Sequence, residues 1–344
     1  RNLSNLAVEM SITAVVSLGM LLVIVAGHID LSVGSGAGLF GGLTAVLMFR
    51  HGWPAPAAMA VSAVLGVVVW AAMGRLIVGQ RIPAFIITLA GLLVFKGLHW
   101  MVIGNATIPV TVGANSNFLN ALTTWYLPPA AGYVLAAVIA AGLFWTGWAS
   151  RRRSIGLTIE PTDLWFSRTF VAAQLVLLFV VVCNQYRGVP LPALILAGVA
   201  ISIGVLLRHT VFGRHLYAVG GNEEAAVISG ISARRVVVGA FAILGFLVAL
   251  CGLMQTAYAG ASTTTIGQLL ELDAIAACVI GGTSLRGGRG TVAGVLFGSL
   301  IMASLLNGLT LRADSPEVKF VARGTVLALA VWLDVRMARY SATS

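Results

Sequence analysis

The chain has 344 residues, of which 59% are hydrophobic and only 9% are charged. Soluble domains are about 25% charged, so this composition excludes a soluble enzyme, a disordered chain, a disulfide scaffold and collagen. The net charge of +10 is typical of nucleic-acid binders, but the basic residues fall between apolar runs, which argues against a nucleic-acid partner. The composition predicts an all-α, polytopic helical membrane protein that forms a single transmembrane domain over residues 1–344.

About 20 apolar residues cross a bilayer as a helix, and eight runs of this kind occur along the chain. They are Leu6–Gly27, Ala55–Val78, Ala84–Ile103, Ala130–Trp148, Phe166–Cys183, Leu191–Leu207, Val236–Tyr258 and Val292–Leu311. Three shorter runs, Gly36–Phe49, Leu269–Ile280 and Phe320–Leu333, are typical of half-helices or re-entrant segments. The sequence therefore predicts nine to eleven membrane segments. Because the chain begins with Arg1, we expect one further helix before it.

Basic residues predict the orientation, because cytoplasmic loops hold an excess of Lys and Arg. If the chain crosses alternately, fourteen basic residues face one side, which we take as cytoplasmic: Arg75, Arg81, Arg151, Arg152, Arg153, Arg168, Arg208, Arg214, Arg234, Arg235, Arg286, Arg289, Arg336 and Arg339. Five face the other side: Arg1, Arg50, Arg187, Arg312 and Lys319. The C-terminus is then cytoplasmic.

The longest polar stretch without a span, residues 208–235, lies on the predicted cytoplasmic side. Asn222 is a suitable helix N-cap, and Glu223 and Glu224 follow in the first turn, where the helix dipole favours carboxylates. We expect a short amphipathic helix over Glu223–Ser229 that ends at Gly230. A capped helix of small residues indicates a docking element for a partner, and a merely soluble connector is the alternative.

Three motifs make the chain resemble the permease subunits of ABC sugar importers of the ribose, xylose and galactose class. They are GHIDLSVGS at 27–35, FGR at 212–214 with GGNEEAA at 220–226, and GGTSLRGGRGT at 281–291. Three further stretches resemble the xylose-transporting members: NQYRGVP at 184–190, LELDAIAA at 270–277 and VWLDV at 331–335. The resemblance spans nearly the whole chain.

This resemblance implies a subunit that passes a pentose, D-xylose in particular, across the inner membrane of a bacterial cell. The implied partners are a second permease copy, a cytoplasmic ATP-binding subunit, a periplasmic sugar-binding protein and membrane lipids. The implied contact with the ATPase is the coupling loop within 208–235, through Gly220, Gly221, Asn222, Glu223, Glu224, Ala225, Ala226 and Gly230.

The chain itself is expected to bind no cofactor and no metal. Its glycine-rich loop, Gly281–Gly290, lacks the Gly-Lys-Ser/Thr ending of a phosphate-binding P-loop. ATP and Mg²⁺ therefore belong to the partner ATPase, and this chain is not an enzyme. An ion-coupled secondary sugar transporter is the alternative. It requires a relay of acidic or polar groups deep in the spans, and no clear relay is formed by Glu9, Asp30, Glu271 and Asp273.

Two of the motifs have a structural interpretation. Asp30 is expected to cap a helix that begins near Leu31, with a direct role in the sugar path as the alternative. The glycine-rich loop is expected to be a tight cytoplasmic connection, with Arg286 and Arg289 at lipid headgroups or at the ATPase. The positions that carry these motifs are Asp30, Ser32, Gly34, Gly281, Gly282, Thr283, Gly287 and Gly288.

A sugar path requires polar groups that match hydroxyls, together with aromatic faces. Candidates within the apolar segments are Gln255, Asn307, Lys96 and Trp100, with Thr256 and Tyr258 as further possibilities. The alternative for each is a helix–helix hydrogen bond or an interfacial anchor. The three cysteines are expected to be small buried hydrophobes.

Overall fold

The computed structural model describes residues 2–111, 117–153, 162–312 and 315–343, so Arg1 lies outside the described part. Each predicted span forms a helix, and the eight helices long enough to cross a membrane are α1 (Asn2–Val25), α3 (Ala55–Gln80), α4 (Ala84–Ile103), α6 (Pro129–Arg153), α7 (Thr162–Asn184), α8 (Leu191–His209), α11 (Ala233–Ala259) and α13 (Val292–Leu311). The chain is a polytopic helical membrane protein, as predicted.

The three shorter apolar runs are also helical. They form α2 (Val33–Phe49), α12 (Leu270–Ile280) and α14 (Pro316–Thr343). The last of these continues well beyond the predicted run. Three short helices lie outside the spans: α5 (Phe118–Thr124), α9 (Val211–Gly221) and α10 (Glu223–Ile228). Two antiparallel pairs of two-residue strands, which the sequence analysis did not predict, join β1 (Ile108–Pro109) to β4 (Ala261–Ser262) and β2 (Tyr126–Leu127) to β3 (Val189–Pro190).

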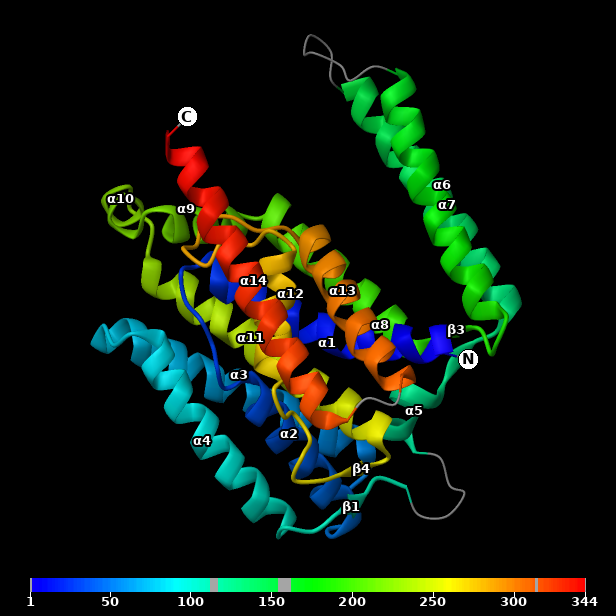
Figure 1. Cartoon of the computed structure of the whole chain (residues 1–344), viewed down its shortest axis with the longest axis vertical. Helices are drawn as coiled ribbons and strands as arrows, with labels where there is room; N and C mark the ends of the chain where they lie inside the picture. Colours follow the sequence, from blue (N-terminus) through cyan, green and yellow to red (C-terminus); the bar gives the residue numbers. More distant parts are fainter. Residues whose placement is uncertain (1, 112–116, 154–161, 313–314, 344) are drawn as a thin grey trace.

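Helix α1 is the centre of the bundle, and most of its side chains are buried. It packs against α8, α11, α12 and α13, while α11 also packs against α2 and α3 (Figure 1). Helices this apolar gain little from the hydrophobic effect inside a bilayer and associate through close packing of small residues. Gly66 of α3 and Gly245 of α11 illustrate this: a Cβ atom at either position would overlap the carbonyl oxygen of the other.

The α6–α7 hairpin leans away from the rest of the bundle (Figure 1). Its contact with the bundle lies near the β2–β3 pair, where Ala136, Val180, Cys183 and Val189 form a small separate core. An apolar cavity of about 550 Å³ lies between α7 and helices α1, α8 and α13.

Helices α2 and α12 both begin inside the bundle, and their first turns lie against each other. The backbone of Gly34, in the first turn of α2, contacts the carbonyl oxygen of Gly267 and the carboxylate of Glu271 at the start of α12. The two short helices therefore meet at their N-termini, as discontinuous helices do in many transporters.

Candidate functional site

The stretch 208–235 is mostly helical, not the loop that the sequence analysis predicted. Thr210 caps α9 by accepting a hydrogen bond from the Gly213 N–H at 3.2 Å. Asn222 caps α10 as predicted, because its side-chain oxygen accepts a hydrogen bond from the Ala225 N–H at 2.9 Å. Helix α10 ends at Ile228, one residue earlier than predicted, and Gly230 then adopts a positive φ of 83°.

Three segments meet backbone to backbone at the end of α1, in a contact that we call the glycine joint: Val25–Gly27, Gly220–Gly221 and Gly287–Gly288. The Gly288 N–H donates a 2.9 Å hydrogen bond to the Val25 carbonyl oxygen. Gly220 packs so closely on the same carbonyl that a Cβ atom would overlap it. The Tyr217 hydroxyl adds a 2.7 Å hydrogen bond to the Gly290 carbonyl. Helix α9 is therefore fixed to both α1 and the turn before α13.

His28 follows the joint, and its imidazole lies within electrostatic range of the Glu223 carboxylate at the start of α10. Burial lowers the pKa of its imidazole, and the carboxylate of Glu223 opposes that shift. Burial is the larger effect, because transferring a cation out of water is costly. The side chain is therefore held in its neutral form at pH 7.

The outer surface of α10 combines acidic and apolar side chains. Glu223 and Glu224 are exposed, and Val227 and Ile228 are 53% and 87% exposed. Arg286 and Arg289, beside the glycine joint, are exposed as well. The exposed Val227 and Ile228 thus form a small apolar patch beside acidic residues outside the spans.

Asp30 does not cap a helix at Leu31 as predicted, because α2 begins at Val33 with Ser32 in the N-cap position. The Asp30 carboxylate is fully buried and accepts hydrogen bonds from the Ser32 N–H at 2.7 Å, the Ser32 hydroxyl at 2.6 Å and the Trp70 indole N–H at 2.6 Å. Three donors satisfy the charge that burial would otherwise make costly. Asp30 thus ties the turn between α1 and α2 to α3.

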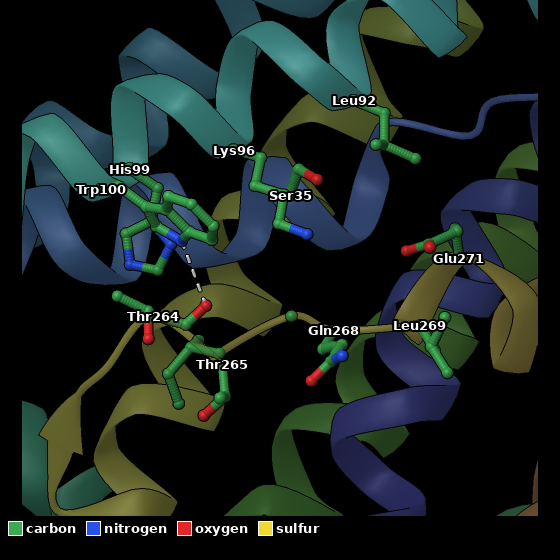
Figure 2. Close-up of a pocket in the computed structure, with 12 residues that line it drawn as sticks. Ser35, Leu92, Lys96, His99, Trp100, Thr264, Thr265, Gln268, Leu269 and Glu271 are labelled. Atoms are coloured by element: carbon green, nitrogen blue, oxygen red, sulfur yellow. Dashed lines mark hydrogen bonds between the residues drawn. The ribbon is translucent and has the colours of Figure 1, made fainter. Parts of the chain in front are cut away.

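A cavity of about 420 Å³ with several polar side chains in its lining, which we call the polar cavity, lies along the C-terminal half of α4. Its walls come from α2, α4, the segment 264–269 and α12 (Figure 2). Pairing of β1 with β4 holds the chain that follows α11 against the chain that follows α4. The Trp100 indole N–H then donates a 3.3 Å hydrogen bond to the Thr264 carbonyl, and His99 lies 3.3 Å from the Ser262 hydroxyl.

Of the predicted path residues, Lys96 and Trp100 line this cavity, with the Lys96 ammonium 5.4 Å from the Trp100 ring centroid. Gln255 and Asn307 do not line it. Asn307 instead forms a 3.0 Å hydrogen bond with Asn2 between α13 and α1, which is the helix–helix alternative. The sequence analysis missed His99 and Glu271 as lining residues. Glu271 could have been found, because a carboxylate in an apolar segment indicates a functional site.

The three cysteines are buried, as predicted. The thiols of Cys251 and Cys278 lie 3.3 Å from the carbonyl oxygens of Ile12 and Ser17 of α1. Within the described ranges, no group of three or more His, Cys, Asp or Glu side chains is placed to hold a metal ion.

Comparison with known proteins gives the family. Residues 2–331 match the family described as the permease component of the branched-chain amino acid transport system. The chain belongs to this permease family. It is 40% identical, over 99% of its own length and 86% of the relative, to the xylose transport system permease protein of Escherichia coli strain K12.

Two other relatives are also permeases. The permease of the xylose transport system of Haemophilus influenzae is 40% identical over 97% of the chain and 88% of the relative. The ribose import permease of Bacillus subtilis strain 168 is 34% identical over 97% of the chain and 84% of the relative. No solved structure matches the chain. The chain is therefore a transport permease that spans the membrane several times.

Proposed function

We propose that this chain is the membrane-spanning subunit of an ATP-driven importer of D-xylose. The observation that carries the proposal is the 40% identity over 99% of the chain to a permease named for xylose transport. Permeases named for ribose import are 33–34% identical over a similar length. Nothing in the comparisons favours the ion-coupled alternative.

The coupling partner in this proposal is a separate ATPase that binds ATP and Mg²⁺ and docks on α9 and α10. The exposed Glu223, Glu224, Val227 and Ile228 support a docked partner at this surface. The glycine joint supports a mechanical role, because movement of α9 is passed by direct backbone contact to the end of α1. In this scheme, closure of the ATPase moves α9–α10, and α1 carries the motion into the centre of the bundle.

The α9–α10 end of the bundle then faces the bacterial cytoplasm. The excess of basic residues on this side supports this orientation, and it puts the C-terminus on the same side. A periplasmic sugar-binding protein delivers sugar to the opposite end, near α5 and the β1–β4 pair. A second copy of the permease completes the path, and the broad apolar surface of α4, which includes Leu93, Val94 and Met101, is available to that copy or to lipid.

The test is uptake of radiolabelled D-xylose by proteoliposomes that contain the permease, its ATPase and its sugar-binding protein. We expect uptake to require ATP on the ATPase side and to require the binding protein. ATP-dependent uptake of another sugar alone would retain the mechanism and overturn the substrate. Uptake that follows an ion gradient without ATP would overturn the importer.

A charge-reversal variant tests the docking surface separately. Glu224→Arg places a cation on the exposed face of α10, where it would oppose any basic partner surface, and we expect ATP-dependent uptake to fall about tenfold or more while membrane insertion stays normal. Asp163→Arg, the same change at an exposed acid in the first turn of α7, is the matched control. Equal uptake by both variants would argue against docking at α10.

A further inference from the structure

We infer that the cavity between α4 and α12 holds one monosaccharide in its uncharged ring form, with the Glu271 carboxylate accepting hydrogen bonds from its hydroxyl groups. This inference rests on the proposed function and specifies where the sugar binds. The cavity, about 420 Å³, lies within the range of pockets that enclose a small ligand. Its lining mixes apolar side chains with a few polar groups, as binding pockets do.

Glu271 is the one acidic group among the lining residues, all of which the structure describes. The residue is only 8% exposed, and its carboxylate lies against the backbone of Gly34. Figure 2 shows the carboxylate directed into the cavity from α12. A buried carboxylate has about four acceptor positions and is costly to leave without donors. Sugar hydroxyl groups supply such donors.

The opposite wall suits the ring of a sugar. Trp100 is 40% exposed, and its hydrogen bond to the Thr264 carbonyl fixes the orientation of the indole. Lys96 lies 5.4 Å from the ring centroid and presents ammonium donors beside the aromatic face. Gln268 adds an amide that both donates and accepts. An aromatic surface together with donors and acceptors is what a polyhydroxylated ring requires.

The same residues select against a charged ligand. Lys96 is the one cation among the lining residues, all of which lie in the described part of the chain, and it shares the cavity with the acidic Glu271. A sugar phosphate carries nearly two negative charges, which a single lysine beside an acidic group cannot compensate away from water. The ligand class is therefore an unphosphorylated monosaccharide.

The backbone around Glu271 restricts the position of its carboxylate. Gly34 of α2 lies so close that a Cβ atom would overlap a Glu271 carboxylate oxygen and the Gly267 carbonyl. Glu271 also lies in the first turn of α12, where the helix dipole stabilises a negative charge. The carboxylate is thus held between the N-termini of α2 and α12, facing the cavity.

The experiment uses the purified full chain alone, so that it is independent of the ATPase. A cysteine at the exposed position 265 (Thr265→Cys), a lining residue with no role in the proposed contacts, is labelled with a maleimide, and Leu92→Cys serves as a second reporter in the same cavity. The native Cys183, Cys251 and Cys278 are 0–2% exposed and give little background. Ser229→Cys, at the exposed C-cap of α10, reports labelling away from the cavity.

We expect D-xylose to slow labelling at 265 and 92 but not at 229, and we expect L-leucine and D-xylose 5-phosphate to have no effect. In Glu271→Ala, the concentration that gives half-protection should rise about tenfold or more, as expected for the loss of a hydrogen bond to a charged group. Glu271→Gln, which keeps one acceptor oxygen, should fall between. Glu317→Gln, at an exposed acid in the first turn of α14, should match the wild type.

Labelling that D-xylose does not slow, in a protein that still imports D-xylose with its partners, would overturn this site and leave the proposed function standing. Protection by L-leucine alone would overturn the ligand class. Equal protection in Glu271→Ala and wild type would overturn the role of Glu271. If the assembled transporter imports no D-xylose while D-xylose still protects position 265, the proposed function fails and the site stands.

Discussion

The indole N–H of Trp70 donates a 2.6 Å hydrogen bond to the carboxylate of Asp30, 40 residues earlier in the chain. Both side chains are fully buried, and the Trp70 ring packs against Phe40 and Phe95 at centroid distances of 5.9 and 5.1 Å. The pair joins α3 to the turn that precedes α2. Neither residue lines the polar cavity, and their buried hydrogen bond indicates that Asp30 contributes to the stability of the fold.

Removing the indole donor should therefore reduce stability. Trp70→Phe leaves one oxygen of a buried carboxylate without its partner, and we expect the free energy of unfolding to fall by about 1–3 kcal/mol. Thermal unfolding in detergent micelles measures the loss. Trp145→Phe, at a position 67% exposed, is the control and should unfold like the wild type. Equal losses in the two variants would contradict a special role for the Asp30–Trp70 pair.

Two adjacent glycines give a matched test of the glycine joint. A Cβ atom at Gly220 would overlap the Val25 carbonyl, whereas a Cβ atom at Gly221 meets no atom within 4 Å. Gly220→Ala should therefore separate α9 from α1, at a cost of about 1–3 kcal/mol from overpacking, and should strongly reduce ATP-driven uptake. Gly221→Ala should retain uptake. Similar uptake by both variants would show that the close contact at Gly220 is unimportant.

Arg323 of α14 and Asp273 of α12 form an ion pair at 3.0 Å. Removing one of the two charges should lower the free energy of unfolding far more than removing both. Asp273 is nearly completely buried, so Arg323→Gln leaves an unpaired buried carboxylate, with an expected loss of about 3–5 kcal/mol. Asp273→Asn combined with Arg323→Gln removes both charges and should recover most of that loss. Unfolding of the two variants and the wild type is the measurement, and a double variant no more stable than the single one would refute this account.

His28 predicts a pH dependence of stability. Burial lowers the pKa of its imidazole in the folded protein from the ordinary value of 6.5, so the unfolded chain binds a proton more readily than the folded one. Above pH 6.5 His28 is neutral in both states and does not reduce stability. As the pH falls below 6.5, protonation of the unfolded chain lowers the free energy of unfolding, and this decrease ends below the folded pKa. Unfolding measured from about pH 7.5, one unit above the ordinary pKa of 6.5, toward lower pH should show this slope, and His28→Asn should flatten it. An unchanged slope in the variant would assign the effect to another group.

The sequence predicted the spans well, because each depends on a local run of apolar residues. The short helix after Asn222 was predicted for the same reason: an N-cap, two acidic residues and a terminal glycine are close together in sequence. Helix α9 was missed because its polar and small residues give only a weak local signal, and its stability comes from contacts of Gly220 and Tyr217 with segments distant in sequence.

Contacts between distant segments also explain what could not be predicted about the candidate site. Lys96 and Trp100 were chosen as polar and aromatic residues in a span, but Asn307 had the same local character and forms a pair with Asn2 instead. Glu271 was noted only as a carboxylate near membrane depth. Its place in the cavity depends on the β1–β4 pair and on Gly34, which no local pattern reveals.

The meeting of α2 and α12 at their first turns has a consequence for biogenesis. These helices have 17 and 11 residues, at or below the lower limit of about 17 for a helix that crosses a bilayer, so their positions depend on packing against other helices. Helix α2 packs chiefly on α4 and α11, and α11 is synthesised much later. The core of the permease is therefore completed only after α11 and α12 have been synthesised.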